Sequence, residues 1–304
     1  MDIATQIRDL ARIKKALILA HNYQLPEIQD IADYTGDSLE LSRTAATMGR
    51  EAGYEIIVFC GVHFMAESAS ILSPDRMVLL PDLSAGCPMA DMAGPEDILE
   101  MKRHYPRAKV VTYINSTAAV KSVSDVICTS SNARVIVDRI DADEIIFVPD
   151  KNLGSYVQRF TKKTIHLWEG FCPTHEAFSL HDLSEIKSRH PGALVMVHPE
   201  CRPEVIDAAD EVLSTGQMVS FVQKTGATSI IVGTEKDMIH RLAKEAPHIT
   251  FIHASPKLTC PNMKKIDYRA LLRSLTDEVH RVEVVGDIRE KAKKALDLML
   301  ELSR

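Results

Sequence analysis

Three stretches decide the fold of this chain: LILAHNY (17–23), VVTYINS (110–116) and LVMVHPE (194–200). Each begins with an apolar run and ends in polar residues, which predicts strands at 16–20, 109–114 and 193–197. Further apolar runs predict strands at 55–60, 77–81, 144–148, 164–168, 229–233 and 249–253. Helical stretches separate these runs, and nearly continuous apolar strands are typical of parallel sheets covered on both faces. The predicted fold class is therefore α/β.

The order of elements recurs three times along the chain. After the first strand, a hydroxyl residue heads a helical stretch, at Ser38, Ser130 and Ser214. A second and a third strand follow, and each unit closes with a Cys-Pro pair, at Cys87, Cys172 and Cys260, which are 85 and 88 residues apart. We therefore predict three similar αβα units around a pseudo-threefold axis. Their expected ranges are 1–92 with an N-terminal helix, 93–178, and 179–304 with a C-terminal helix. An ordinary doubly wound sheet is the alternative.

Composition excludes several classes of protein. With 304 residues and 45% hydrophobic residues, the chain has enough apolar side chains for a folded core. Six Cys are too few for a disulfide-stapled secreted scaffold. A net charge of −6 argues against a nucleic-acid surface, and no apolar run is long enough for a signal peptide or a membrane span. We expect a soluble cytoplasmic protein without nucleic-acid or membrane partners.

The three cysteines in register indicate a metal centre. Ligands of open α/β units lie beyond the carboxyl ends of the strands, so Cys87, Cys172 and Cys260 would converge on the threefold axis. Three thiolates suit zinc or an iron–sulfur cluster with one open iron. The chain has no C-x-x-C pair, which favours the cluster. Cys60 and Cys128 share no register and are predicted to be buried thiols, while the role of Cys201 stays open.

Polar residues at the ends of the first strands suggest acid–base chemistry. They are His21, Tyr23, Tyr113, Asn115, His198 and Glu200. Histidine and glutamate are the side chains most readily tuned for proton transfer near neutral pH, and tyrosine also serves. The alternative is that each is an ordinary core or surface residue.

Hydroxyl residues at helix starts suggest an anion-binding pocket. Ser38, Ser130 and the pair Ser214-Thr215 are candidate helix N-caps, and such termini also bind phosphate or carboxylate. His175 follows Cys172 closely enough to orient a substrate carboxylate. Lys224 is a lone cation, either solvated or part of the site. No sequence signature of a nucleotide cofactor is present.

The chain resembles the quinolinate synthases, bacterial and archaeal enzymes of de novo NAD biosynthesis, over nearly its whole length. The resemblance is carried by ILAHNYQLPEIQDIADYTGDSLELSR, FCGVHFMAE, LLPDLSAGCPMADM, TYINSTAAVKSVSDVICTSSNA, WEGFCPTHE, VMVHPEC and FVQKTGATSIIVGTE. It implies condensation of iminoaspartate with dihydroxyacetone phosphate to quinolinate, phosphate and water. It also implies one oxygen-sensitive [4Fe-4S] cluster per chain, with an open iron as Lewis acid. An l-aspartate oxidase or dehydrogenase would supply the iminoaspartate.

The resemblance also implies roles for residues at matching positions. The implied cluster ligands are Cys87, Cys172 and Cys260, and the implied catalytic residues are Tyr23, Glu200 and His21. The implied substrate-binding residues are His21, Tyr23, Ser38, Tyr113, Asn115, Ser130, His175, His198, Glu200, Ser214 and Thr215. Some family members carry a C-terminal C-x-x-C-x-x-C stretch that this chain lacks, so a redox disulfide there is not expected.

Several rival interpretations remain at this stage. Hydroxymethylbutenyl diphosphate reductases and diphthamide-synthesis enzymes also place one Cys from each of three units around a cluster. A non-catalytic iron–sulfur sensor or a structural zinc protein are further alternatives.

Overall fold

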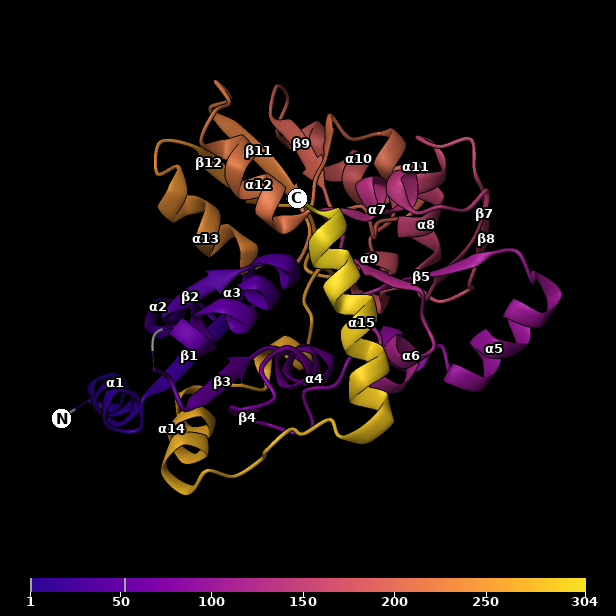
Figure 1. Ribbon diagram of the computed structural model, residues 1–304. Coiled ribbons are helices and arrows are strands. Elements are labelled where there is room, and N and C mark those ends of the chain that lie inside the picture. The colour runs from indigo at the N-terminus through magenta and orange to yellow at the C-terminus, as the bar shows by residue number, and fades with distance from the viewer. Residues whose placement is uncertain (1, 52) are drawn as a thin grey trace.

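Each of the three predicted repeats forms a sheet of its own. The computed structural model describes residues 2–51 and 53–304, and Figure 1 shows its three sheets around a common centre. All three are parallel and four-stranded, in the orders β2-β1-β3-β4, β6-β5-β7-β8 and β10-β9-β11-β12. This confirms the α/β prediction with three similar units and excludes a single doubly wound sheet.

All nine predicted strands are present, and each sheet has one short strand more. The nine are β1 (Ala16–His21), β3 (Ile56–Cys60), β4 (Met77–Leu79), β5 (Lys109–Tyr113), β7 (Glu144–Val148), β8 (Thr164–Leu167), β9 (Leu194–Val197), β11 (Ser229–Gly233) and β12 (Thr250–His253). The additional edge strands are β2 (Tyr34–Gly36), β6 (Val126–Cys128) and β10 (Glu211–Val212). At two or three residues, they are too short to show a hydrophobic period.

The expectation of strands buried on both faces holds for the inner strands but not for the edge strands β8 and β12. β1 and β3 are buried at every residue. β8 and β12 lie at sheet edges, and none of their residues is fully buried. An edge strand has a neighbour on one side only, so its side chains keep part of their contact with solvent.

Helices cover the sheets and give each unit its layered architecture. In the first unit these are α1 (Ile3–Ile13), α2 (Pro26–Ile31), α3 (Ser38–Glu51), α4 (His63–Leu72) and η1 (Pro88–Asp91). In the second they are α5 (Pro95–His104), α6 (Ala118–Ser122), α7 (Ala133–Arg139), α8 (Lys151–Gln158) and α9 (Pro173–Glu176). In the third they are α10 (Leu180–Arg189), α11 (Pro203–Asp207), α12 (Thr215–Val222) and α13 (Met238–Glu245). Three more follow: η2 (Asn262–Lys264), α14 (Tyr268–Asp277) and α15 (Gly286–Leu302).

The last two helices pack on the first two units, although they follow the third sheet in sequence. α14 packs against α1 and β3, and α15 against α4, α6, α7 and β6 (Figure 1). Near the end of α15, Ser303 accepts a hydrogen bond from Asn132 at 2.8 Å and Arg43 reaches its carbonyl at 3.2 Å. The C-terminal segment thus joins the first unit to the second.

An aspartate binds the first strand of every unit. The carboxylates of Asp33, Asp125 and Asp210 accept the N–H groups of Ile18, Val110 and Val195 at 2.8, 2.8 and 2.7 Å, respectively. The backbone N–H of each aspartate donates to the carbonyl of the same partner. Three residues beyond the partners lie His21, Tyr113 and His198. This shared contact therefore shows that these side chains occupy one equivalent position in the three units.

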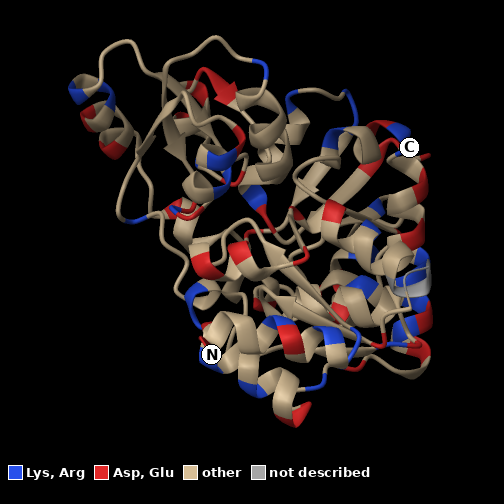
Figure 2. Ribbon diagram, turned by 90° about the vertical axis from the view of Figure 1, so that its left-hand side faces the viewer, with Lys and Arg blue, Asp and Glu red and all other residues tan. Residues whose placement is uncertain are grey.

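The surface carries both signs of charge. In the view of Figure 2, Lys and Arg are interspersed with Asp and Glu over the outer helices. Of the helices within the described ranges, none combines the length and the apolar character that crossing a bilayer requires.

Candidate functional site

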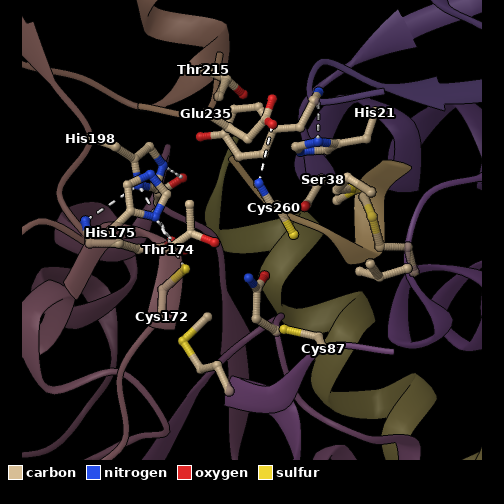
Figure 3. Close-up of a pocket in the computed structure, with 18 of the residues that line it drawn as sticks. His21, Ser38, Cys87, Cys172, Thr174, His175, His198, Thr215, Glu235 and Cys260 are labelled. Carbon is tan, nitrogen blue, oxygen red and sulfur yellow. Dashed lines mark hydrogen bonds and ion pairs between the residues drawn. The ribbon is translucent and has the colours of Figure 1, made fainter. Parts of the chain in front are cut away.

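The carboxyl ends of the strands of all three units open into one cavity. It is lined by residues of all three units (Figure 3). Its lining includes these predicted site residues: His21, Tyr23, Ser38, Cys87, Tyr113, Asn115, Ser130, Cys172, His175, His198, Glu200, Thr215 and Cys260. Ser214 is buried beside the cavity as the N-cap of α12, accepting the N–H of Gln217 at 3.3 Å.

Three free cysteines face this cavity, one from each unit. Cys87, Cys172 and Cys260 precede η1, α9 and η2, and Figure 3 shows their sulfur atoms directed toward the same space. Burial raises the pKa of all three thiols, that of Cys87 to about 12. A bound cation would reverse this, because a metal-coordinated thiol is deprotonated.

The surroundings of these cysteines fit a metal group. Val62, Phe64, Met65, Met89 and Met263 line the same cavity and keep it apolar. Potential ligand atoms of Cys172, His175 and Glu200 lie within 4.8 Å of one another, which is consistent with a metal cofactor.

The other cysteines are buried away from the cavity. Cys60 in β3 and Cys128 in β6 are fully buried, as predicted, and burial raises the pKa of both. Cys201 is also fully buried, 3.5 Å from the carbonyl oxygen of Gly233, and does not line the cavity.

Two histidines present ring N–H groups to the site. The backbone N–H of Tyr23 donates to Nδ1 of His21 at 3.2 Å, and that of Glu200 to Nδ1 of His198 at 3.3 Å. Burial lowers the pKa of His21 to about 4 and that of His198 to about 3. Both rings are therefore neutral near pH 7, with the proton on Nε2. In His198, this proton points to Oγ of Ser130, which lies 3.2 Å from Nε2.

Glu200 is the centre of a buried polar network. Its Oε2 lies 2.7 Å from Nδ1 of His175, and its Oε1 accepts the hydroxyl of Tyr113 at 2.5 Å. Burial raises the pKa of Glu200, but His198, His175 and these hydrogen bonds outweigh it and leave the pKa below its usual value. Burial and the charge of Glu200 raise the pKa of neighbouring Asp150, which is therefore the neutral member of the pair.

Two tyrosines border the network with their hydroxyl protons in place. Burial, together with the charge of Glu200, raises the pKa of Tyr23 and Tyr113 well above its usual value. The hydroxyl of Tyr23 lies 2.6 Å from Oγ1 of Thr234, which in turn lies 2.8 Å from Nε2 of His175. Both tyrosines are therefore hydrogen-bond donors at neutral pH.

The predicted N-caps are only partly correct. Ser214 caps α12, but Asp37 rather than Ser38 caps α3, accepting the N–H groups of Leu39 and Glu40 at 2.9 Å each. A carboxylate is a stronger acceptor than a hydroxyl and takes this place. Ser130 lies ahead of Asn132, the residue that precedes α7. The three loops nevertheless meet, because Oγ of Ser131 contacts both Asp37 and Ser214, the latter at 3.0 Å.

Sequence reasoning missed several residues of the cavity wall, notably Asp37, Thr174 and Glu235. Oε1 of Glu235 accepts the N–H of Cys260 at 3.2 Å and pairs with Lys264 at 2.8 Å. Its place two residues after β11, at the carboxyl end of a strand, was the available signal. Lys224 is exposed at the end of α12 and lies outside the cavity lining.

Comparison with known proteins assigns the chain to a family. A family model described as quinolinate synthetase A protein matches residues 5–301. The chain is 50% identical to quinolinate synthase from Geobacter sp. (strain M21) over 302 residues, 99% of this chain and 98% of that protein. It is 48% identical to quinolinate synthase from Methanoregula boonei over 297 residues, 98% of this chain and 97% of that protein. The resemblance seen in the sequence is thus confirmed, and the chain belongs to the quinolinate synthetase A family.

Proposed function

We propose that this chain is a quinolinate synthase that condenses iminoaspartate with dihydroxyacetone phosphate to quinolinate, phosphate and water. Family membership supports the activity, since the relatives carry that name over full length. The observation that carries the proposal is one cavity in which three cysteines from three units face Glu200 and its partners.

Cys87, Cys172 and Cys260 would hold a [4Fe-4S] cluster, one ligand from each unit. Three separate loops can hold a bulky group from three sides, and part of the cavity wall is apolar. When bound, a cluster with three protein ligands has one open iron, which supplies Lewis-acid chemistry. The other proposed roles, proton transfer and substrate binding, belong to side chains of the protein.

Glu200 and Tyr23 would carry the proton transfers. Glu200 is ionised, so it takes up protons, and the hydroxyls of Tyr113 and Tyr23 donate hydrogen bonds. His21 presents Nε2–H to the substrate from the opposite unit. Condensation, loss of phosphate and dehydration all require such proton movements, and buried acid–base groups perform them without competition from solvent.

Neutral donors would bind the anionic groups of the two substrates. Ser38, Ser130 and Thr215 line the cavity, and Thr215 is the first residue of α12, whose N-terminus favours anions. His198, His175 and Asn115 add donors for carboxylates. Ser214 would act through the helix cap rather than by direct contact.

The remaining sequence-based expectations are part of the same proposal. They comprise the unit boundaries after residues 92 and 178, a cytoplasmic location, and an l-aspartate oxidase or dehydrogenase as the source of iminoaspartate. This imine hydrolyses in water, so an enzyme that forms it must work alongside this one.

Anaerobic reconstitution tests the proposal. We expect about four irons and four sulfides per chain, and quinolinate from dihydroxyacetone phosphate and enzymatically generated iminoaspartate. Cys87→Ala, Cys172→Ala and Cys260→Ala should lose the cluster, whereas Cys60→Ala should keep it. One zinc per chain without sulfide would refute the cluster. No quinolinate from cluster-replete protein would favour the sensor alternative.

A further inference from the structure

We infer that Thr234 is a positioning residue of the active site, joining Tyr23 to the His175–Glu200 pair through its hydroxyl group. This inference rests on the proposed function. The residues form one continuous buried chain of hydrogen bonds: Tyr23 Oη to Thr234 Oγ1 at 2.6 Å, Thr234 Oγ1 to His175 Nε2 at 2.8 Å, and His175 Nδ1 to Glu200 Oε2 at 2.7 Å. This series of hydrogen bonds thus connects the two proposed acid–base residues, Tyr23 and Glu200.

The carboxylate of Glu200 only accepts, so Nδ1 of His175 carries a proton. The proposed positioning uses the His175 tautomer in which Nε2 is an acceptor, so the hydroxyl of Thr234 donates to it. The remaining lone pairs of Thr234 accept the proton of Tyr23, whose pKa is raised by burial. A hydroxyl is required at this point, because it must donate and accept at once.

The fold does not require a hydroxyl at this position. The register pairs Ala20 with Cys60, Thr112 with Val148 and Val197 with Gly233, so Thr234 corresponds to the residues that follow Cys60 and Val148. These residues are Gly61 and Pro149, which have no hydrogen-bonding side chain. Only the third unit places a hydroxyl here, and it is also the unit that supplies His198 and Glu200.

Two contacts show why the loss of this hydroxyl would reach the substrate. Thr234 itself is fully buried and does not line the cavity, so it acts through Tyr23 and His175, which do. Without the Thr234 hydroxyl as donor, the tautomer of His175 that carries its proton on Nε2 becomes more favourable. In that tautomer, Nδ1 directs a lone pair toward Glu200. Without the acceptor, the hydroxyl of Tyr23 rotates free of its fixed orientation.

Thr234→Val is the main test, because valine keeps the branched shape and removes only the hydroxyl. We expect kcat for quinolinate formation to fall about 100-fold, the lower end of what a positioned acid–base group contributes. KM should change less than about threefold, because His175 is the one proposed carboxylate donor that contacts Thr234. Thr234→Ser keeps the hydroxyl and should restore kcat to within about threefold of the wild type.

Thr112→Val is the matched control. Thr112 is also fully buried, and its hydroxyl pairs with Ser124 at 2.6 Å, away from the cavity. This variant should keep kcat. Iron and sulfide contents of all variants should equal those of the wild type.

Two further measurements keep the inference open to refutation. Tyr23→Phe combined with Thr234→Val should lose no more activity than the worse single variant, because both changes break the same chain of bonds. A crystal structure of Thr234→Val should show Tyr23 or His175 displaced. If Thr234→Val does not fold, Thr234→Ala replaces it with the same expected results.

The inference is overturned if Thr234→Val holds its cluster and keeps kcat within threefold, or if Thr234→Ser is as inactive as Thr234→Val. Absence of quinolinate from the wild-type enzyme would instead refute the proposed function. In that case the crystal structure of Thr234→Val still decides whether Thr234 orients Tyr23 and His175.

Discussion

Replacing Lys264 by methionine is expected to destabilise the third cysteine loop and the contact between two units. Lys264 donates to the carbonyl oxygen of Tyr23 at 2.6 Å and pairs with Glu235 at 2.8 Å and Asp237 at 2.5 Å. The side chain of Glu235 is 0% exposed, so water does not replace the lost partner. Methionine keeps much of the volume of lysine and removes the charge.

The size of the effect follows from these contacts. Removing one partner of a buried ion pair costs about 3–5 kcal/mol, because the other charge stays buried. Glu235 keeps two backbone donors, the N–H groups of Cys260 at 3.2 Å and Asp237 at 2.9 Å. We therefore expect a loss at the lower end, about 3 kcal/mol in the free energy of unfolding at pH 8.

The loss should also depend on pH in a defined direction. Burial raises the pKa of Glu235, and Lys264 opposes this, so the variant has a still higher pKa at this carboxyl. A group whose pKa is raised by folding destabilises the folded state when it is ionised, and protonation relieves this. The difference in the free energy of unfolding between variant and wild type should therefore be largest at pH 8. It should shrink as the pH falls through the raised pKa of Glu235.

Urea unfolding followed by circular dichroism at pH 8 and pH 5 measures both effects. The matched control is Lys265→Met, since Lys265 is exposed and reaches only the carbonyl oxygen of Ser84. Anaerobically prepared Lys264→Met should also hold less iron, because Glu235 fixes the backbone of Cys260. A loss below about 1 kcal/mol, or a loss equal at both pH values, would refute the reasoning.

Three further changes test other parts of the structure. Glu200→Gln should lower kcat about 10²- to 10⁴-fold with unchanged iron content, measured by quinolinate formation. Lys121→Met should stabilise metal-free protein at pH 7 by about 1–3 kcal/mol. Lys121 is fully buried, burial lowers its pKa to about 8, and the gain should disappear as the pH rises past the ordinary lysine pKa. Asp125→Asn should cost about 1–3 kcal/mol by weakening the bond to Val110. Although burial alone raises the pKa of Asp125, its partners lower it, so this cost should shrink below about pH 4 as the wild-type carboxyl is protonated.

The sequence predicted the fold well wherever an element was long and apolar. Each of the nine buried runs forms a strand, because four or more apolar residues bounded by turns have few alternatives in a parallel sheet. The edge strands β2, β6 and β10 were not predicted, because two or three residues are too few to show a hydrophobic period. Their shared marker is an aspartate at the residue before each strand, whose carboxylate binds the neighbouring first strand.

The site was predictable where topology alone brings residues together. Side chains at the ends of first strands and the three Cys-Pro loops meet because all sheets point their carboxyl ends at one centre. Thr234 and Lys264 were not predictable, because their roles depend on contacts with residues of another unit. The hydroxyl of Thr234 meets Tyr23 across 211 positions of sequence, and no local pattern records such a contact.

The cavity also explains how a protein with a net charge of −6 can bind two anionic substrates. Among the described residues, those that line it include neither Lys nor Arg. Buried histidines take the place of cations: with pKa values of about 4 and 3, His21 and His198 are neutral and present fixed N–H donors. Hydroxyls and the start of α12 add further donors without net charge. Such donors need no counter-ions in the empty site, and their short-range contacts are screened by salt far less than exposed cations are. Selectivity for the substrates then depends on the positions of these donors. The aspartates that bind the first strand of each unit hold the ends of those strands in place.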